Sequence, residues 1–518
     1  MEGLTRPMED RKRQLLFCLT CVFAWGLMAH AYGFLHSSFS HDSLLEFNGD
    51  GLSNRIRISN GRFLSPVCRW IFRTDMTLPW LVGVLGLLWI GLSAYLILRL
   101  FRLKTPAAAI LVSGFLTANL TVSATAATFL HDFDCDMLAL LTAVGAVFCW
   151  NRGKWGFLPG AVLVMLSLGL YQSYICVSIV LILFVCVTEL LDGEKAKSVI
   201  CKGLRACAML LLGGIIYYVL MKLVVRLSGI QMLSNVYNSL DRPAKLLEAS
   251  WFDIRYVFKA TYRLYFERII QVLSPFPTVT QGATAVLLAV SGLALFAEVL
   301  SSKVGWPEKL LVLILAALVP FGGNLMHFVT MGSADHELMV YSYWLIYLLP
   351  LLLLPRLPWD KLAKPVSWVK PICAGLIVVL ICAQVQVANV LYLKKDLEQD
   401  AYLSVMTRVV YRMEETEGYI PGETPVVMVG LPQQLNDTIP GFEAYRKPNG
   451  MWMTDVLNYG DSGHWAAYFK YILLNPAKIV SGSKMTDDPR VQALPCYPAQ
   501  GCTAIIDGTT AESSPNVR

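Results

Sequence analysis

The chain has 518 residues, of which 55% are hydrophobic and only 15% are charged. A soluble protein of this length would form several domains with about 25% charged residues, so the composition excludes an ordinary soluble protein. The formal net charge of +6 is spread over many short loops, which argues against nucleic-acid binding and for orientation across a bilayer. We therefore expect a polytopic α-helical membrane protein.

A transmembrane helix needs about 20 mainly apolar residues. Apolar runs near this length predict about eleven spans, at 14–33, 79–100, 107–130, 134–150, 156–170, 174–191, 204–224, 283–300, 310–329, 339–355 and 371–393. The first run follows basic residues and lacks a small-residue cleavage signature. It is therefore predicted to be a span rather than a removed signal peptide.

Basic residues predict the side of the membrane on which each loop lies, because cytoplasmic loops are rich in Lys and Arg. If the basic start at 11–13 is cytoplasmic, the even-numbered connections should carry the basic residues, and they do. These residues are Arg99, Arg102, Lys104, Arg152, Lys154, Lys195, Lys197, Lys202, Arg205, Lys303, Lys309, Arg356, Lys361, Lys364 and Lys370. The short odd-numbered connections, around 131–133, 171–174 and 330–338, contain none. The pattern requires 156–191 to cross twice, and it predicts an N-terminus inside and a C-terminus outside.

Two long outer loops, 34–78 and 225–282, do contain basic residues, but long loops are largely exempt from this rule. In the first loop, 66–75 is predicted to form an interfacial helix with apolar residues on one face and arginines on the other. The apolar residues are Val67, Trp70 and Ile71, and the arginines are Arg69 and Arg73. The second loop has a similar mixture of aromatic and basic residues. Both stretches are interpreted as anchors at the headgroup level, or as platforms that hold a lipid phosphate.

The composition changes after residue 394, which divides the chain into a transmembrane part (1–394) and an extracytoplasmic part (395–518). The second part is predicted to be a small α/β domain with a disordered tail. Its helices are expected at 395–417 and 462–474, its strands at 425–429 and 503–506, and its tail from Thr509. Cys496 and Cys502 flank a short loop and either form a disulfide or stay free.

Acidic and histidine side chains gather at the outer ends of the predicted spans. They are Asp42 and Glu46 in the first outer loop, His131, Asp132, Asp134 and Asp136 before the fourth span, and Asp335, His336 and Glu337 before the tenth. Ionisable groups at membrane depth are costly and by default indicate function. We therefore expect these groups to line one outward-facing cavity.

Each candidate also has a structural interpretation. Asp42 is a possible helix cap, and Asp132 and Asp136 favour the start of a helix dipole. Arg62 either pairs with a loop acid or binds a phosphate. His336 is more typical of a polar rim than of a metal ligand, because no second His lies at ligand spacing. Tyr171, Gln172 and Tyr174 either lie at the membrane interface or line a sugar site.

Several short blocks occur in a fixed order along the chain. They are His41-Asp42-Ser43-Leu44, Gly61-Arg62-Phe63, Leu78-Pro79-Trp80-Leu81-Val82-Gly83, residues 133–140, residues 171–175 and His336-Glu337-Leu338-Met339. Their succession resembles the bacterial Gtr-type (type II) glucosyltransferase family. The resemblance implies a GT-C type membrane enzyme that takes a sugar from a polyprenyl-phosphate carrier and adds it to a cell-surface glycan. Family members are best known for glucosylating O-antigen, which implies a bacterial cytoplasmic membrane and an active site on its outer face.

The GT-C pattern places an essential acid in the first outer loop, which implies Asp42 as the catalytic base and Glu46 as the alternative. Transfer from a sugar phosphate needs a base for the acceptor hydroxyl and cations for the departing phosphate. We predict Arg62 as the phosphate partner and direct displacement with inversion at the anomeric carbon. The further substrate-binding candidates are Asp132, Asp134, Asp136, Tyr171, Gln172, Tyr174 and His336. No metal ligands are predicted, although a divalent metal is compatible with this chemistry; the partners are the lipid-linked sugar, the glycan and membrane lipids.

A secondary transporter or lipid-linked sugar flippase is the competing interpretation, because it also has many spans and buried acids. Transporters commonly show internal repeats and polar residues at the bilayer midplane. Here no repeat is evident, and the acids lie at the outer ends of the spans. A non-catalytic membrane scaffold would not explain three acidic clusters on one side.

Overall fold

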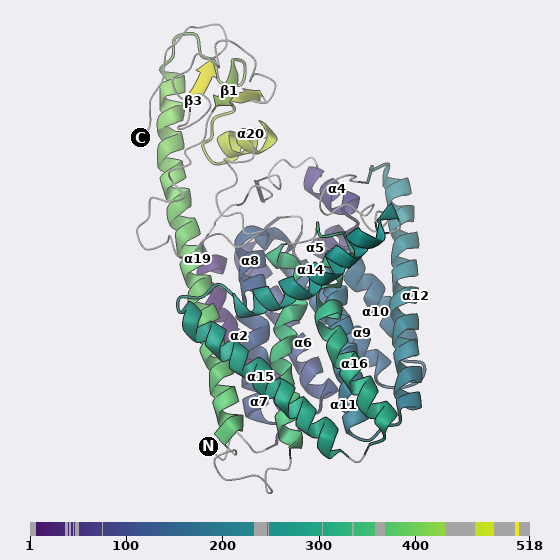
Figure 1. Ribbon diagram of the computed structural model, residues 1–518. Coiled ribbons are helices and arrows are strands. Elements are labelled where there is room, and N and C mark those ends of the chain that lie inside the picture. Colours follow the sequence, from purple (N-terminus) through teal and green to yellow (C-terminus); the bar gives the residue numbers. More distant parts are fainter. Residues whose placement is uncertain are drawn as a thin grey trace.

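The structure is a computed structural model, shown in Figure 1. It describes residues 7–36, 40, 43–44, 46, 51–74, 76–232, 246, 248–302, 304–333, 336–357, 368–429, 462–480 and 503–506. The predicted base Asp42, Asp335, the cysteines Cys496 and Cys502, and the tail from Thr509 lie outside these residues.

Within the described residues, eight helices are long and apolar enough to cross a membrane. They contain α2 (Arg11–Leu35), α6 (Pro79–Leu100), α9 (Phe133–Trp150), α11 (Ile175–Leu191), α12 (Ala196–Ser228), α15 (Pro277–Ser301), α16 (Trp306–Gly323) and α19 (Val369–Glu414). Helices α7 (Pro106–Thr117) and α8 (Leu120–Thr128) bend by 42° at their junction and together would form a ninth span. The chain is therefore a mostly helical, membrane-embedded protein, while the count of eleven and its sidedness remain predictions.

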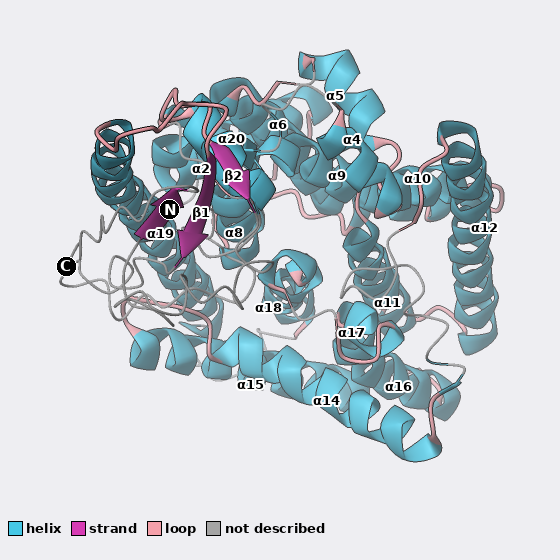
Figure 2. Ribbon diagram, turned by 90° about the horizontal axis from the view of Figure 1, so that it is seen from above, coloured by secondary structure: helices cyan, strands magenta, loops and turns pink. Residues whose placement is uncertain are grey.

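The two remaining predicted spans take other helical forms. Residues 156–170 correspond to the short helix α10 (Phe157–Leu170). Residues 339–355 are divided among η4 (Glu337–Met339), η5 (Tyr341–Tyr347), α18 (Leu348–Leu353) and η6 (Leu354–Arg356). Seen from above, α18 lies inside the surrounding helices rather than at their edge (Figure 2).

Side-chain hydrogen bonds stabilise these irregular segments. At the α7–α8 junction, Asn119 Nδ2 donates to the carbonyls of Phe115 and Leu116 at 3.0 Å, and its Oδ1 caps α8 through Val122 N at 3.0 Å. In η5, Tyr341 Oη donates to Leu116 O at 2.6 Å. Buried polar groups therefore receive partners where the regular helix ends.

Helices α6 and α9 pack closely next to the acidic residues that begin α9. A Cβ at Gly86 on α6 would overlap the ring of Phe133, which lies between Asp132 and Asp134. Small residues allow such close helix approach in membranes. The position of these acids therefore depends on the glycine.

We expect Gly86→Ala to lower stability by about 1–3 kcal/mol, because the added methyl group must displace Phe133. Thermal unfolding in detergent would measure the loss. Gly214→Ala is the matched control, because Gly214 lies in α12 with no heavy atom within 4 Å of an added Cβ. Equal stability of the two variants would contradict the packing argument.

Three further helices lie at the upper end of the bundle: α4 (Leu52–Ser59), α5 (Ser65–Arg73) and α14 (Trp251–Ile270). Figure 1 shows α14 running across this end, and α14 packs against α15 and α16. Its first residues, Trp251 and Phe252, are exposed, whereas Val257 and Tyr265 are buried. This arrangement is typical of a helix that lies in the membrane interface.

Helix α19 has 46 residues, so it is about 69 Å long at about 1.5 Å per residue, while the hydrocarbon core is about 30 Å thick. It therefore extends well beyond the bundle, as Figure 1 shows. Beside its far end lie α20 (Ser462–Tyr471) and a sheet of order β2-β1-β3. Strand β1 (Pro425–Val429) pairs parallel with β2 (Lys478–Val480) and antiparallel with β3 (Thr503–Ile506).

The end of α19 and these small elements share a second hydrophobic core, separate from the core of the bundle. It includes Tyr402, Met406 and Trp465. Leu44 of the first outer loop is fully buried in the same core. The loop that contains the predicted catalytic acids is therefore fixed to the C-terminal part of the chain.

Candidate functional site

A buried cluster of four charged side chains lies at the upper end of the bundle: Glu46, Arg57, Arg69 and Asp132, here called the Glu46 cluster. Arg57 Nη2 donates to Glu46 Oε1 at 2.5 Å, and Arg57 Nε donates to Asp132 Oδ1 at 2.7 Å. Arg69 donates to both carboxylate oxygens of Glu46, with Nη1 3.1 Å from Oε1. The four side chains are at most 8% exposed. Two cations and two anions therefore compensate one another away from water.

Helix α5 contributes arginines to this region through the face that would be the wet face of a soluble helix. Arg69 and Arg73 lie one turn apart and so share a face, and both are buried. Trp70, on the opposite face, is 75% exposed. In a membrane interface the apolar face can meet lipid, so the arginines can point toward the protein.

Asp134 is held by Arg73 through two parallel hydrogen bonds. Arg73 Nε lies 2.8 Å from Asp134 Oδ2, and Arg73 Nη2 lies 3.1 Å from Asp134 Oδ1. The same guanidinium also donates to the carbonyls of Met76, at 2.6 Å, and His131. This bidentate geometry joins α5 to the start of α9.

Glu46 remains ionised because of its basic neighbours. Burial raises the pKa of its carboxyl group, but His131, Arg69 and Arg57 lower it further, and the pKa falls to about 2. A general base works best when its pKa is near the working pH. The geometry of Glu46 therefore favours anchoring of the two arginines over proton transfer.

A cavity of about 70 Å³ lies beside the Glu46 cluster. It is lined by Ser53, Ile56, Arg57, Asn60, Arg62, Phe129, His131, Asp132, Asp136, Tyr171, His336, Leu338 and Met339. The cavity thus joins the first outer loop, the start of α9, the break before α11 and the segment around η4. Five of the predicted substrate-binding residues meet there.

Two lining residues have the properties of reacting partners. The Arg62 guanidinium lies 4.2 Å above the ring of Tyr171, which fixes its position by a cation–π contact. Asp136 is buried in the wall of the cavity, and among the described residues it forms no ion pair within 4.0 Å. Asp132 and Asp134, in contrast, are bonded to arginines.

The family model described as Glucosyl transferase GtrII matches residues 31–354. The match covers more than half of the chain and contains every residue that lines the cavity. The chain belongs to the GtrII glucosyltransferase family. This confirms the resemblance inferred from the ordered blocks. No curated protein and no solved structure shows significant similarity to the chain.

Two of the candidate residues of this GtrII glucosyltransferase lie outside the cavity wall. Gln172 Nε2 donates to Asn60 O at 2.9 Å and to Tyr217 Oη at 3.0 Å. The Tyr174 ring is buried, with its centroid 5.7 Å from that of Tyr171 and 5.5 Å from that of Tyr341. Both side chains therefore support the residues that line the cavity.

Sequence reasoning did not identify Arg57, Arg69, Arg73 and His131 as parts of the GtrII site. Arg69 and Arg73 were noticed as the polar face of an interfacial helix, and Arg57 gave no signal of its own. The available signal was indirect, because buried carboxylates such as Asp132 and Asp134 require cationic partners. Within the described ranges, no group of three or more His, Cys, Asp or Glu side chains is arranged to hold a metal ion.

Proposed function

We propose that this glucosyltransferase moves glucose from a polyprenyl-phosphate donor to a cell-surface glycan on the outer side of a bacterial cytoplasmic membrane. The observation that carries the proposal is the cavity in which Arg62, Asp136 and Tyr171 meet beside the Glu46 cluster. It offers a fixed cation for a phosphate and a carboxylate outside the ion pairs. A family of glucosyltransferases requires both for transfer from a sugar phosphate.

The surroundings of the cavity favour a lipid-linked donor. Helix α5 exposes Val67, Trp70 and Ile71 on one face and buries Arg69 and Arg73 on the other. A polyprenyl chain could lie against the exposed apolar face while its phosphate reaches the cationic side. A soluble nucleotide sugar would have no use for that apolar surface.

In the proposed reaction, the acceptor hydroxyl oxygen attacks the anomeric carbon of the glucose. The bond from that carbon to the phosphate oxygen breaks, and its electron pair stays on the polyprenyl phosphate, which Arg62 stabilises. The hydroxyl proton passes to a carboxylate, either Asp136 or Asp42. Direct displacement inverts the anomeric centre, and Glu46 acts as an anchor for Arg57 and Arg69.

The proposed division of the chain assigns catalysis to residues 1–394 and a supporting role to residues 395–518. Leu44 supports this division, since it is fully buried in the core that includes Tyr402 and Met406. Leu44 stands between Asp42 and Glu46 in the chain. The C-terminal part would thus hold the acidic loop in place on the outer side.

Transfer itself can be tested with purified protein in liposomes, polyprenyl-phosphate [¹⁴C]glucose and the glycan of a strain that lacks the gene. We expect label to move from the lipid to the glycan. Movement of labelled lipid across the bilayer without any labelled glycan would instead support a flippase and contradict the proposal.

Arg62→Ala should lower the transfer rate by about 10²–10³-fold, because the departing phosphate loses a fixed cation. Arg62→Lys should restore only part of the rate, since Lys keeps the charge but loses the planar fork. Initial rates with the labelled donor would measure both effects. Arg263→Ala is the control, because Arg263 is exposed on α14. Full activity of Arg62→Ala would remove this residue from the mechanism.

A further inference from the structure

A second and larger cavity lies at the opposite end of the bundle. Its volume is about 620 Å³, a size typical of a site for a small organic ligand. It is formed where α6, α9 and α11 end, where α12 begins and where η6 follows α18. Helix α9 begins beside Asp132 and ends at Trp150 in this cavity, so its 18 residues separate the two cavities by about 27 Å. The second cavity is therefore distinct from the proposed active site.

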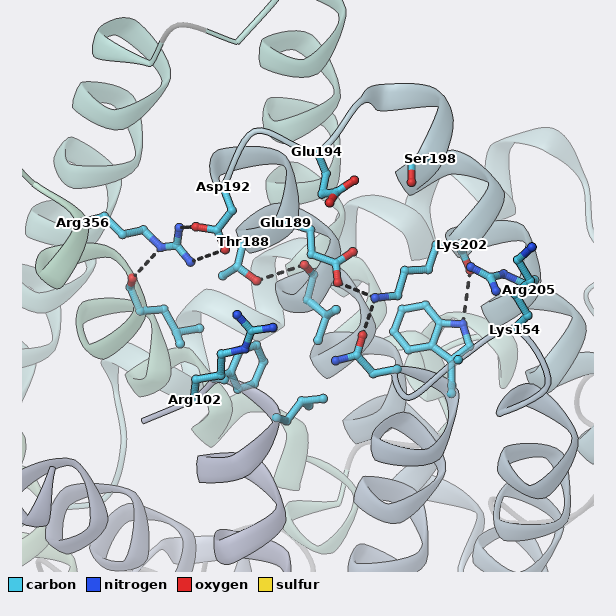
Figure 3. A pocket seen from close by; sticks show the side chains of 17 residues that line it. Arg102, Lys154, Thr188, Glu189, Asp192, Glu194, Ser198, Lys202, Arg205 and Arg356 are labelled. Carbon is cyan, nitrogen blue, oxygen red and sulfur yellow. Dashed lines mark hydrogen bonds and ion pairs between the residues drawn. The ribbon is translucent and has the colours of Figure 1, made fainter. Parts of the chain in front are cut away.

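Basic side chains dominate the wall of this cavity, as Figure 3 shows. The wall has five basic residues against three acidic ones. Two of the basic residues are paired: Lys202 with Glu189, and Arg356 with Asp192. The other three basic residues are Arg102, Lys154 and Arg205, and within the described part of the chain they form no ion pair within 4.0 Å.

Arg102 occupies a backbone position that favours glycine. Its φ is +55°, in the left-handed region that a non-glycine residue rarely adopts. It directly follows the end of α6, and Leu103 N donates to Leu98 O at 2.8 Å, which completes a Schellman motif around Arg102. Glycine would fit this position better, so the backbone does not explain the arginine. In Figure 3 its guanidinium is directed toward the space between the two ion pairs.

Aromatic residues indicate that this cavity lies at the level of the lipid headgroups. Trp150 lines the cavity and its Nε1 donates to Lys202 O at 3.2 Å. Trp155, in the turn that follows α9, is 75% exposed. Tryptophan is enriched at the boundary between the hydrocarbon core and water.

We propose that this cavity binds a phosphate group through Arg102, Lys154 and Arg205. Guanidinium and ammonium groups around a cavity of this size suit the oxygens of a phosphate mono- or diester. The phosphate is either that of an anionic lipid headgroup or a soluble one. The site is independent of glucose transfer, so binding can succeed or fail whatever the reaction proves to be.

Two probes distinguish the sources with full-length protein. Native mass spectrometry would compare bound phosphatidylglycerol with phosphatidylcholine, and thermal unfolding in detergent would be followed with inorganic phosphate against chloride at equal ionic strength. The decisive variant is Arg102→Gly, which removes the guanidinium and relieves the backbone. We expect its unfolding temperature to stay equal or rise while binding weakens by about tenfold. The triple variant Arg102→Gly, Lys154→Gln, Arg205→Gln should lose binding.

Lys197→Gln is the matched control, because Lys197 is exposed on the same first turns of α12 but does not line the cavity. Selective retention of phosphatidylglycerol by wild type and Lys197→Gln would assign the site to a lipid headgroup. Stabilisation by inorganic phosphate alone would assign it to a soluble ligand. Absence of binding of either probe to the wild type, or equal binding by wild type and Arg102→Gly, would overturn the proposal.

Discussion

Asp136→Asn should reduce glucose transfer by about 10²–10⁴-fold and leave the protein folded. Asparagine has nearly the same shape as aspartate but cannot take the proton of the acceptor hydroxyl. Asp136 lines the cavity beside Arg62 and, among the described residues, forms no ion pair that the substitution would break. Initial rates with the labelled lipid donor, together with thermal unfolding, would separate lost chemistry from lost structure.

A parallel Asp42→Asn variant decides which carboxylate is the base. If Asp136 takes the proton, its substitution should lower the maximal rate, whereas Asp42→Asn should have a smaller effect. If Asp42→Asn alone abolishes transfer, Asp136 binds the sugar and the base lies in the first outer loop. Asp400→Asn is the control, since Asp400 is exposed on α19. Full transfer by both Asp42→Asn and Asp136→Asn would contradict the base-assisted mechanism.

Apolar length predicted where the helices lie but not how they are interrupted. The run 107–130 reads as one span, yet the structure breaks it at Asn119, whose side chain satisfies the backbone on both sides of the break. The run 339–355 reads as another span, yet it begins as 3₁₀-helix, with Tyr341 bonded to Leu116 O. Both interruptions depend on partners far along the chain, which the hydrophobicity of one segment does not contain.

The candidate site shows a similar division. Charge sidedness predicted that the acids around 131–136 and His336 would share one end of the bundle, and Asp132, Asp136 and His336 do line one cavity. The inward direction of Arg69 was not predictable from periodicity. A period of 3.6 residues shows that a helix has two faces, but the solvent on each side decides which face points inward. The strand β2 (Lys478–Val480) was missed because three residues give no alternating pattern.

Glu46→Gln should destabilise the protein by about 3–5 kcal/mol, because it leaves Arg57 and Arg69 buried with only Asp132 as a charged partner in the cluster. Thermal or chemical unfolding in detergent would measure the loss. Glu267→Gln is the control, since its pair with Arg263 is exposed and should contribute no more than about 1 kcal/mol. Loss of transfer at unchanged stability would contradict the anchoring role and restore Glu46 as a candidate base.

The same variant should remove a specific dependence of stability on pH. The pKa of Glu46 falls from 4.5 to about 2 in the folded protein, so the unfolded chain takes up this proton first as the pH is lowered. The stabilisation, roughly 3 kcal/mol at about 1.36 kcal/mol per pKa unit, is therefore complete above pH 4.5 and is lost as the pH falls toward 2. Unfolding temperatures of wild type and Glu46→Gln should differ by a constant amount between about pH 5 and 8 and converge below that range. A difference that stays constant down to about pH 3 would show that the charge of Glu46 does not stabilise the cluster.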